Sequence, residues 1–285
     1  LSEKLNRQDS DNIYIGLDTN GRRWDQLKFL WHIWSARIVY SIGGDYKKGG
    51  VFKIACILRK KMIMHWVGTD VLKARNAVLQ GVIDRKFLNK VNHLAVVSWL
   101  RNELSDIDID ATVKYIASHR GESTMKPLPD VFSVLTYIGK GREEFYGINH
   151  IISLAEDFPE LKISVAGIDV YKAPLPENIQ LLGWVKDMDA RYDECTLFVR
   201  LPEHDGLGYS VIEALSKGRY VALSNNFPET YHINEYADLK KVIEDLMAKY
   251  RDKTLEQNRK GFEFVQDHFE EKQVLKELIS FFKHC

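Results

Sequence analysis

A glycine-containing loop and the helix after it, within residues 202–224, carry the residue types best suited to chemistry in this chain. Asp205 and Glu213 have seven residues between them, and Gly206 and Gly208 belong to that interval. Such a loop directs backbone N–H groups and the positive end of a helix dipole toward one place, where an anion can bind. Carboxylates beside that place can accept hydrogen bonds from hydroxyl groups. The pattern therefore predicts a ligand with both phosphate and hydroxyl groups, such as a sugar nucleotide.

The helix in this stretch should begin near residues 208–210 and end at Gly218, because glycine is common just past a helix C-terminus. A buried parallel strand at 220–223 should follow it. A simpler alternative makes Asp205 a turn residue of the loop and Glu213 a solvated residue of the helix. The glycines around them favour the functional interpretation over this one.

The second half of the sequence alternates between strand and helix patterns. Short apolar runs predict strands, and longer segments with apolar residues at helical spacing predict helices. This alternation predicts βαβ units with a parallel sheet flanked by helices, and therefore an α/β fold. The expected strands are 131–138, 161–167, 178–182 and 196–200, the expected helices are 147–158 and 187–194, and the tail is helical over 235–250 and 255–283.

One strand of the first half leads to further candidate residues. Residues 61–67 run into the turn Gly68-Thr69-Asp70, where Asp70 can cap the next helix. His65 and Trp66 lie at the carboxyl end of that strand, which is where open α/β sheets bind ligands. The alternative is that His65 is a hydrogen-bonded histidine of the core.

Other segments of the first half are amphipathic. A short strand at 12–15 should precede a helix over 24–34, in which tryptophans and leucines recur at helical spacing. Residues 47–61 surround an apolar stripe with six Lys and Arg side chains. That pattern is typical of a helix with one buried face and a solvated basic face. It is also compatible with a surface that rests on anionic lipid headgroups.

The distribution of charge predicts two domains. The net charge is zero, but residues 1–126 contain 21 Lys/Arg and 13 Asp/Glu, a balance of +8, and the rest carries −8. Residues 118–130, which contain two prolines and a glycine, coincide with this change and resemble a linker. We therefore expect an N-terminal domain over 1–120 and a second domain over 127–265, and the helix over 266–285 could pack back on the first. The start of the chain resembles the end of a helix, so the first strand of the N-terminal domain should lie outside this sequence.

The bulk composition limits the classes of protein. With 45% hydrophobic and 28% charged residues, the 285-residue chain has the composition of a soluble globular protein. Its three cysteines form no C-x-x-C pair, so neither a disulfide framework nor a zinc site is expected. No apolar run reaches the roughly 20 residues of a membrane helix, and the start has no signal-like region. These features favour a cytoplasmic protein, and the inner face of the membrane is a further place where it could act.

Four short motifs, in order, resemble those of the GT4-like family of retaining glycosyltransferases, which has the GT-B fold. They are Gly139-Lys140, Val165-Ala166-Gly167, Leu182-Gly183-Trp184-Val185, and Asp205-x7-Glu213-Ala214 with Gly218. The likeness covers residues 131–230 in detail and is looser before them. It implies two Rossmann-like domains facing a cleft, the first binding the acceptor and the second binding a nucleotide-sugar donor. It implies no metal and no cofactor.

The resemblance also implies roles for individual residues. Glu213 would accept both ribose hydroxyls of the donor, and Asp205 would hold hydroxyls of the transferred sugar. Lys140 and Arg142 would neutralise the phosphates, and His65 would take part in catalysis with Asp205, Glu213 and Lys140. The other expected donor contacts are Gly139, the nucleobase segment Gly183, Trp184 and Val185, and the loop residues Gly206, Leu207, Gly208, Tyr209 and Ser210.

The sequence departs from the family pattern at three positions. Tyr146 stands where the family has a phosphate-binding lysine, so one cation is missing unless Arg142 replaces it. Asp205 is one methylene shorter than the usual glutamate. Val67 replaces a histidine before the Gly-Thr-Asp turn, but His65 shares its strand face because side chains alternate along a strand. These departures bear on catalysis more than on donor binding.

The function expected from the sequence is transfer of a sugar from a nucleotide donor to a glycan or lipid-linked acceptor, in cell-surface polysaccharide or glycolipid synthesis. The +8 balance of the first half would suit an anionic acceptor or contact with an anionic membrane. The alternatives are a non-catalytic subunit that binds nucleotide sugars and another GT-B enzyme, such as a nucleotide-sugar epimerase. A nucleic-acid partner is not expected, because no base-stacking pattern or DNA-binding helix is present.

Overall fold

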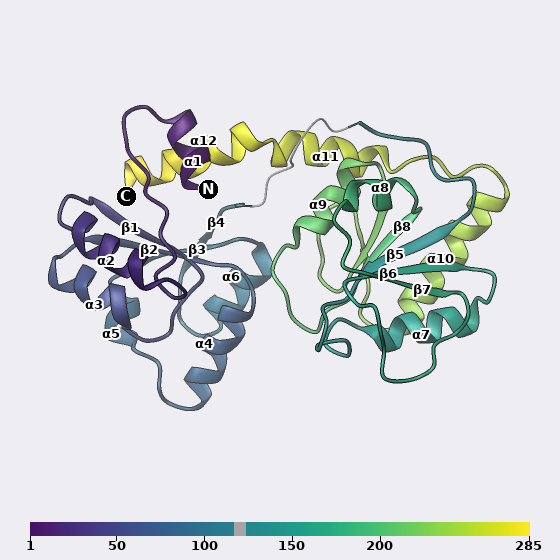
Figure 1. Ribbon diagram of the computed structural model, residues 1–285, viewed down its shortest axis with the longest axis horizontal. Helices are drawn as coiled ribbons and strands as arrows, with labels where there is room; N and C mark the ends of the chain where they lie inside the picture. The colour runs from purple at the N-terminus through teal and green to yellow at the C-terminus, as the bar shows by residue number, and fades with distance from the viewer. Residues whose placement is uncertain (117–123) are drawn as a thin grey trace. The chain divides into compact units, whose positions relative to one another are not determined.

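The computed structural model describes residues 1–116 and 124–285. The chain forms two compact units, of which unit 1 comprises Leu1–Ile116, His204–Leu207 and Glu271–Cys285 (Figure 1). Unit 2 comprises the described residues of Ala117–Glu203 together with Gly208–Glu270. Part of the expected linker 118–130 lies outside the described residues. Each unit therefore contains segments that are distant in the sequence.

Unit 1 is built on a four-stranded parallel sheet in the order β1-β2-β3-β4. Each strand is joined to its neighbour through helical segments, as parallel pairing requires. The strands are β1 (Ile38–Ile42), β2 (Lys61–Trp66), β3 (Asn92–Ala95) and β4 (Ala111–Val113), and the helices are α1 (Ser2–Gln8), α2 (Arg23–His32), α3 (Gly50–Ile57), α4 (Thr69–Leu79), α5 (Arg85–Leu88), α6 (Ser98–Ser105) and α12 (Glu271–His284).

Residues 12–15, which the sequence predicted to be a strand, do not form one. Local polar contacts hold this segment instead. Asn6 Oδ1 accepts a hydrogen bond from the Tyr14 backbone N–H at 2.7 Å, and Tyr14 donates its hydroxyl to Asp9 at 2.6 Å. Because these bonds satisfy the backbone and side chain of Tyr14 locally, the segment does not join the sheet.

The central strand β2 is buried on both faces. Met62, Met64 and Trp66 point into one hydrophobic cluster of unit 1. Ile63 belongs to a second cluster, which α12 supplies with Leu278 and other apolar side chains. Helix α1 lies beside α12 (Figure 1). Both layers of helices are therefore needed to cover this sheet.

Unit 2 is built on a six-stranded parallel sheet in the order β10-β9-β8-β5-β6-β7. The predicted α/β fold with helix-flanked parallel sheets is confirmed here. The strands are β5 (Ser133–Tyr137), β6 (Lys162–Ala166), β7 (Ile179–Gly183), β8 (Leu197–Arg200), β9 (Tyr220–Leu223) and β10 (Tyr231–His232), and the helices are α7 (Ile148–Asp157), α8 (Met188–Asp193), α9 (Tyr209–Ser216), α10 (Tyr236–Arg251) and α11 (Arg259–Phe269).

The helical tail predicted over 255–283 is interrupted. Asn258 accepts a hydrogen bond from the Gly261 backbone N–H and so caps the start of α11. Glu270 has extended backbone angles, φ −59° and ψ 130°, and separates α11 from α12. The sequence has no glycine or proline at this break. Two helices therefore replace the single one, and α11 belongs to unit 2 whereas α12 belongs to unit 1.

Candidate functional site

The strand order of unit 2 defines where a ligand should bind. The chain runs from β5 through β6 to β7 on one side, and then returns to β8 on the other side of β5. Open α/β sheets bind ligands at such a switch point, outside the carboxyl ends of the two strands. The loop that holds Gly139, Lys140 and Arg142 follows β5, and the segment that leads to α9 follows β8. The topology thus brings two of the sequence-predicted motifs to one edge.

Helix α9 begins at this edge. Gly208 is its N-cap residue and provides no capping side chain. The first N–H groups of a helix have no partner within the helix, and they carry the positive end of its dipole. Tyr209 and Ser210 form the first turn of α9. Their backbone N–H groups are suited to an anionic group of a ligand, as the sequence predicted.

Arg200, the last residue of β8, is a site residue that the sequence reasoning missed. Only 8% of it is exposed. Its guanidinium carbon lies 5.9 Å from the ring centroid of Tyr137 and 5.5 Å from that of Tyr146. A Cβ on Gly208 would lie 2.9 Å from Arg200 Nε, so a larger residue at the start of α9 would displace the arginine. An arginine that ends an otherwise apolar strand is the sequence signal that could have identified it.

Tyr146, which the resemblance aligned with a lysine, has two arginines beside its ring. A Cβ on Gly139 would lie 2.9 Å from this ring, so the ring packs directly on the loop after β5. The guanidinium carbons of Arg142 and Arg200 each lie 5.5 Å from its centroid, and Arg142 lies 4.0 Å from the Phe145 ring. Aromatic faces attract guanidinium groups. The missing lysine is therefore accompanied by two arginines around one ring.

Glu213 lies on the second turn of α9, where Tyr192 of α8 orients it. The Tyr192 hydroxyl donates a hydrogen bond to Glu213 Oε2 at 3.0 Å. Burial, together with the Glu213 charge, raises the pKa of Tyr192 far above its usual range, so the phenol keeps its proton. This bond fixes one carboxylate oxygen of Glu213. The sequence reasoning missed Tyr192, because its role depends on how α8 packs against α9.

The other residues of unit 2 that the sequence predicted to contact the donor lie along the same edge of the sheet. Lys140 donates to Asp169 at 3.1 Å, and this bond holds the pKa of the Asp169 carboxyl below its usual range. A Cβ on Gly183 would lie 3.4 Å from that of Asp169. The loops after β5, β6 and β7 thus meet here. Trp184 is largely exposed and Val185 is half-buried. An exposed ion pair is worth little, so Lys140 can turn toward a ligand at small cost.

The loop that carries Asp205 belongs to unit 1. Trp99 of α6 donates its indole N–H to the Asp205 backbone oxygen at 2.9 Å. His204 Nε2 lies 3.0 Å from a carboxylate oxygen of Glu103, also on α6. The structure thus assigns Asp205 to unit 1, and Glu213 with the rest of α9 to unit 2.

Gly206 is required by a close approach of two backbones. A Cβ on Gly206 would collide with the carbonyl oxygen of Val67, in the turn between β2 and α4. Leu207 packs against the hydrophobic cluster of unit 1. In the same turn, Asp70 Oδ1 accepts the Gly68 N–H at 2.7 Å, and its Oδ2 accepts the Gly44 N–H at 2.6 Å. The turn is therefore rigid enough to hold the Asp205 loop.

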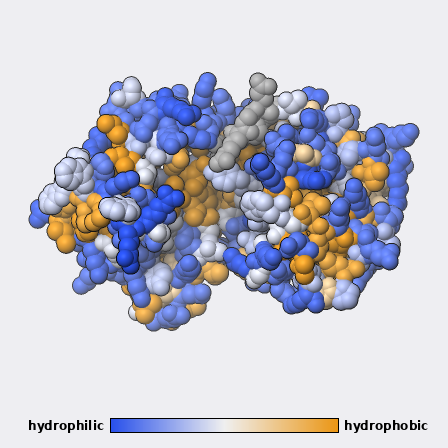
Figure 2. Space-filling model, viewed as in Figure 1, coloured by the Kyte–Doolittle hydropathy of each residue, from blue (hydrophilic) through white to orange (hydrophobic). Residues whose placement is uncertain are grey.

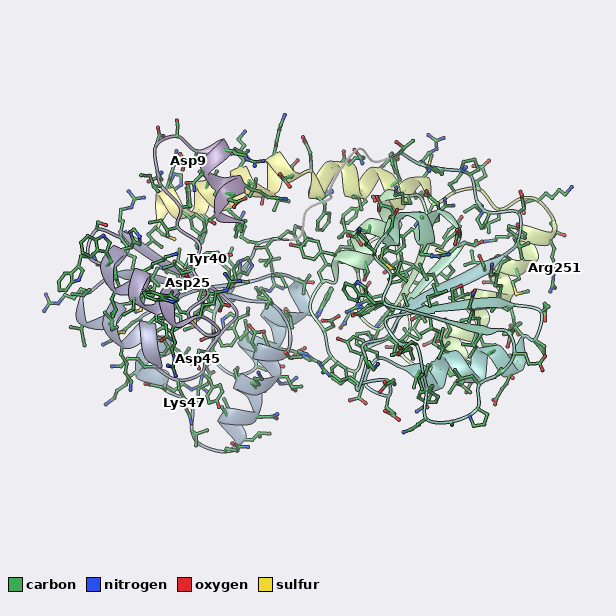
Figure 3. The ribbon with its side chains drawn as sticks, in the orientation of Figure 1. Asp9, Asp25, Tyr40, Asp45, Lys47 and Arg251 are labelled. Carbon is green, nitrogen blue, oxygen red and sulfur yellow. The ribbon has the colours of Figure 1, made fainter. Side chains whose placement is uncertain are left out.

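His65, for which the sequence predicted a catalytic role, lies in the interior of unit 1. The side chain is completely buried. Tyr40, labelled in Figure 3, places its hydroxyl 2.7 Å from His65 Nδ1, and His65 Nε2 lies 2.8 Å from the Lys114 carbonyl oxygen. Phe282 of α12 packs on Tyr40 with ring centroids 5.0 Å apart. Helix α12 thus covers the strand face on which His65 lies, and the geometry favours a core histidine.

The burial of His65 predicts a pH-dependent stability. Burial lowers the pKa of His65 from 6.5 to about 4, so the folded chain keeps this ring neutral. The unfolded chain binds the proton near pH 6.5, so stability should be complete above that pH and fall as the pH drops toward 4. The loss from this group should reach about 3 kcal/mol. Denaturant unfolding at a series of pH values measures it.

The matched variant for this measurement is His65→Gln, which keeps polar partners for Tyr40 and Lys114 but does not titrate. Its stability should depend less on pH between about 6.5 and 4 than that of the wild type. His93, whose pKa burial also lowers, remains in both proteins and contributes in the same direction. Equal pH slopes in the two proteins would show that His65 is not the titrating group.

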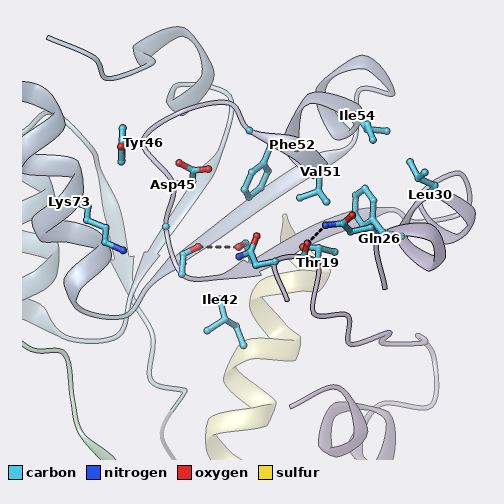
Figure 4. A pocket seen from close by; sticks show the side chains of 17 residues that line it. Thr19, Gln26, Leu30, Ile42, Asp45, Tyr46, Val51, Phe52, Ile54 and Lys73 are labelled. Carbon is cyan, nitrogen blue, oxygen red and sulfur yellow. Dashed lines mark hydrogen bonds between the residues drawn. The ribbon is translucent and has the colours of Figure 1, made fainter. Parts of the chain in front are cut away.

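Unit 1 contains a pocket of about 900 Å³ at the carboxyl end of β1 (Figure 4). Phe29 and Leu30 of α2 form one wall, and Phe52 of α3 contributes to another. Asp45 and Lys73 bring opposite charges to its lining. The lining of the pocket therefore combines polar and apolar surface in equal parts.

Comparisons with known proteins identify the fold. No protein-family model and no curated protein sequence matches this chain. Among solved structures, Anabaena HepE in complex with UDP-glucose has a TM-score of 0.69 at 13% identity, covering 93% of this chain and 84% of HepE. A glycosyltransferase from Rickettsia africae has a TM-score of 0.66 at 14% identity, covering 99% and 86%. Sucrose-phosphate synthase from Thermosynechococcus elongatus has a TM-score of 0.66 at 14% identity, covering 95% of this chain and 80% of the synthase. The chain shares the fold of these proteins.

Within the described residues, no helix is long and apolar enough to cross a membrane.

Proposed function

We propose that this chain is a retaining glycosyltransferase of the GT-B type that transfers a sugar from a nucleoside diphosphate donor. The observation that carries the proposal is the grouping of Arg200, the start of α9 and Glu213 at the switch point of unit 2. A cation with helix N–H groups suits a diphosphate, and a carboxylate suits ribose hydroxyls. The solved structures of similar fold include HepE with UDP-glucose and the pneumococcal O-GlcNAc transferase GtfA with UDP and GlcNAc.

In this proposal the protein stabilises the leaving diphosphate without a metal ion. Charge develops on the diphosphate as the bond to the sugar breaks, and fixed cations and N–H groups lower the barrier to that step. Arg200, Lys140 and Arg142 would supply the positive charge, and the N–H groups of α9 would supply the dipoles. Asp205 would hold hydroxyls of the transferred sugar, and the segment Gly183–Val185 would contact the nucleobase.

Unit 1 would bind the acceptor. Its pocket at the end of β1 combines apolar walls with Asp45 and Lys73, which suits an acceptor that has both apolar and polar parts. We propose a glycan or lipid-linked acceptor, as in the synthesis of cell-surface polysaccharide or glycolipid. An anionic acceptor or membrane would complement the positive balance of the first half of the sequence.

A thermal-shift screen followed by a turnover assay tests this function. A ligand that binds only the folded chain raises its apparent stability, so uridine, guanosine and adenosine diphosphates and their sugars identify the donor. The nucleotide sugar that raises the unfolding temperature is then incubated with the protein and candidate acceptors, with and without EDTA. We expect transfer, or slow release of free sugar, that EDTA does not reduce. NMR of the product should show the anomeric configuration of the donor.

Two residues favour one alternative, a subunit that binds nucleotide sugars without catalysis. Tyr146 replaces a family cation, and Val67 replaces a family histidine. If the chain binds a nucleotide sugar but forms neither product nor free sugar with any donor, the binding subunit is the better description. If none of the nucleotides shifts the unfolding temperature, both descriptions are wrong.

A further inference from the structure

Helix α2 of unit 1 presents an apolar face that nothing in the described part of the chain covers. None of its residues is buried. Trp24, Trp31 and the following Trp34 are 77%, 80% and 71% exposed, and Leu27 and Leu30 are exposed as well. We call these five residues the tryptophan face. The sequence predicted a helix here, but periodicity of this kind usually marks a face that packs inside.

The helix is nevertheless anchored to unit 1. Ile33, just after α2, is buried in the hydrophobic cluster of the unit, and Phe29 packs partly against it. Lys60 donates a hydrogen bond to the Trp34 backbone oxygen at 2.8 Å. The tryptophan face is therefore held in place on a folded support. Figure 2 shows hydrophobic side chains at the surface of the part of unit 1 that holds α2 and α3.

Positive charge accompanies the tryptophan face. Residues 22–61 contain ten Lys and Arg but only two Asp, which accounts for the whole +8 balance of the first half. Arg22 and Arg23 begin α2, and Lys28 lies within it. The Lys60 bond to Trp34 brings the basic turn Arg59–Lys61 beside the last tryptophan.

The structure shows how much of the apolar stripe in 47–61, for which the sequence suggested contact with lipid, is left exposed. Helix α3 buries Phe52 and Ala55, and its Val51 and Ile54 pack partly against the same cluster. Ile57 of α3 is 79% exposed, but the rest of the apolar stripe packs against the core of unit 1. Lys47, Lys48, Lys53 and Arg59 are exposed and available for headgroups, and most of the apolar contact comes from α2.

We infer that the tryptophan face docks unit 1 onto an anionic lipid bilayer. Indole rings prefer the membrane–water interface, where their apolar body and polar N–H are both satisfied. Basic side chains around them attract anionic headgroups, so the charge and the apolar area act together. The basic side chains complement anionic lipid, whereas two copies of this basic surface would repel each other, so the charge favours lipid over a second copy of this chain. The role of this docking, which is to bring unit 1 to a lipid-linked acceptor, rests on the proposed function. The docking surface itself does not.

Vesicle sedimentation with the full chain tests the inference. The probes are vesicles of phosphatidylcholine alone and of phosphatidylcholine mixed with phosphatidylglycerol. The wild type should sediment with the anionic vesicles only, and added salt should weaken this binding because surface charges are screened. Its tryptophan fluorescence should shift to shorter wavelength as the indoles leave water. Equal sedimentation with both vesicles, or none with either, overturns the inference.

The variant Trp24→Ser/Trp31→Ser should bind anionic vesicles at least ~10-fold more weakly, since it loses two interfacial indoles. Both positions are exposed, so its unfolding temperature should match that of the wild type. Leu79→Ser, which removes another exposed apolar side chain of unit 1 at the end of α4, is the matched control and should bind as the wild type does. Unchanged binding by the double variant contradicts the inference.

Light scattering without vesicles tests whether a second copy of this chain, rather than lipid, covers the tryptophan face. A wild-type dimer that the double variant converts to monomer shows that a second copy covers the tryptophan face, and this overturns lipid docking. The nucleotide thermal shift is measured on the same preparations. If the double variant loses vesicle binding but keeps the nucleotide thermal shift, the effect concerns the tryptophan face alone. If the wild type shows no nucleotide thermal shift, the proposed function is wrong, whatever the vesicle binding.

Discussion

Replacing Glu213 with alanine should abolish sugar transfer and weaken nucleoside diphosphate binding on the order of 100- to 1000-fold, because two hydrogen bonds to a charged acceptor are lost. In the proposed complex, the two carboxylate oxygens accept bonds from the ribose hydroxyls, and Tyr192 fixes one of those oxygens. Calorimetric titration measures the affinity, and product formation measures the transfer. A 2′,3′-dideoxy nucleotide, which lacks those hydroxyls, should lose little on the same substitution.

The variants Tyr192→Phe and Glu213→Gln separate this role from a structural one. Tyr192→Phe removes only the hydroxyl that orients Glu213, so it should weaken binding about 10-fold, less than Glu213→Ala does. Glu213→Gln keeps an acceptor for the buried Tyr192 hydroxyl and should unfold at the temperature of the wild type. If Glu213→Gln and Glu213→Ala bind the nucleotide as the wild type does, Glu213 is a solvated helix residue and the donor site lies elsewhere.

Arg200→Met should weaken binding of a nucleoside diphosphate on the order of 100-fold, because a charge-assisted pair with the phosphates is lost. Methionine keeps an apolar contact with the rings of Tyr137 and Tyr146 but removes the charge. The affinity for the corresponding nucleoside, which has no phosphate, should change little. Titrations of both ligands against wild type and variant therefore assign the effect to the phosphates.

Arg142→Met is the comparison for this experiment. Arg142 shares the Tyr146 ring with Arg200, but it is exposed, and water screens the charge of an exposed side chain. We expect it to lose less affinity than Arg200→Met. A larger loss for Arg142→Met would make Arg142 the substitute for the family lysine, as the sequence alone suggested. No loss for either variant would remove both from the site.

The parts of the fold that depend on local patterns could be predicted from the sequence. Most strands and helices of unit 2 follow from short apolar runs and helical spacing, and the start of α9 follows from its glycines. Strand β10 and the end of α11 were not predicted. The sheet order then brings the Gly139 loop and α9, both expected to contact the donor, together at one edge. Such elements can be predicted because each depends on a few residues that are close in the sequence.

Other parts depend on contacts that periodicity cannot reveal. Tyr192 entered the candidate site only when its neighbour on α9 was known. Arg200 had one sequence signal, its place at the end of an apolar strand, but its contacts with two tyrosine rings depend on the fold. His65 is buried because α12, more than 200 positions later, covers its strand. The spacing of Trp24 and Trp31 predicted their helix, but it could not indicate whether a partner within the chain covers that face.

The location of α12 has a consequence for the order in which the chain can fold during synthesis. The strands of unit 1 leave the ribosome first, yet the side of the sheet that carries Ile63 and His65 stays uncovered until α12 emerges. Domains generally fold from the N-terminus as they are made. Here unit 2 can complete its fold while unit 1 still waits for its last helix. A ribosome-bound nascent chain that ends before Glu271 should therefore protect unit 2 from protease and leave unit 1 open to it.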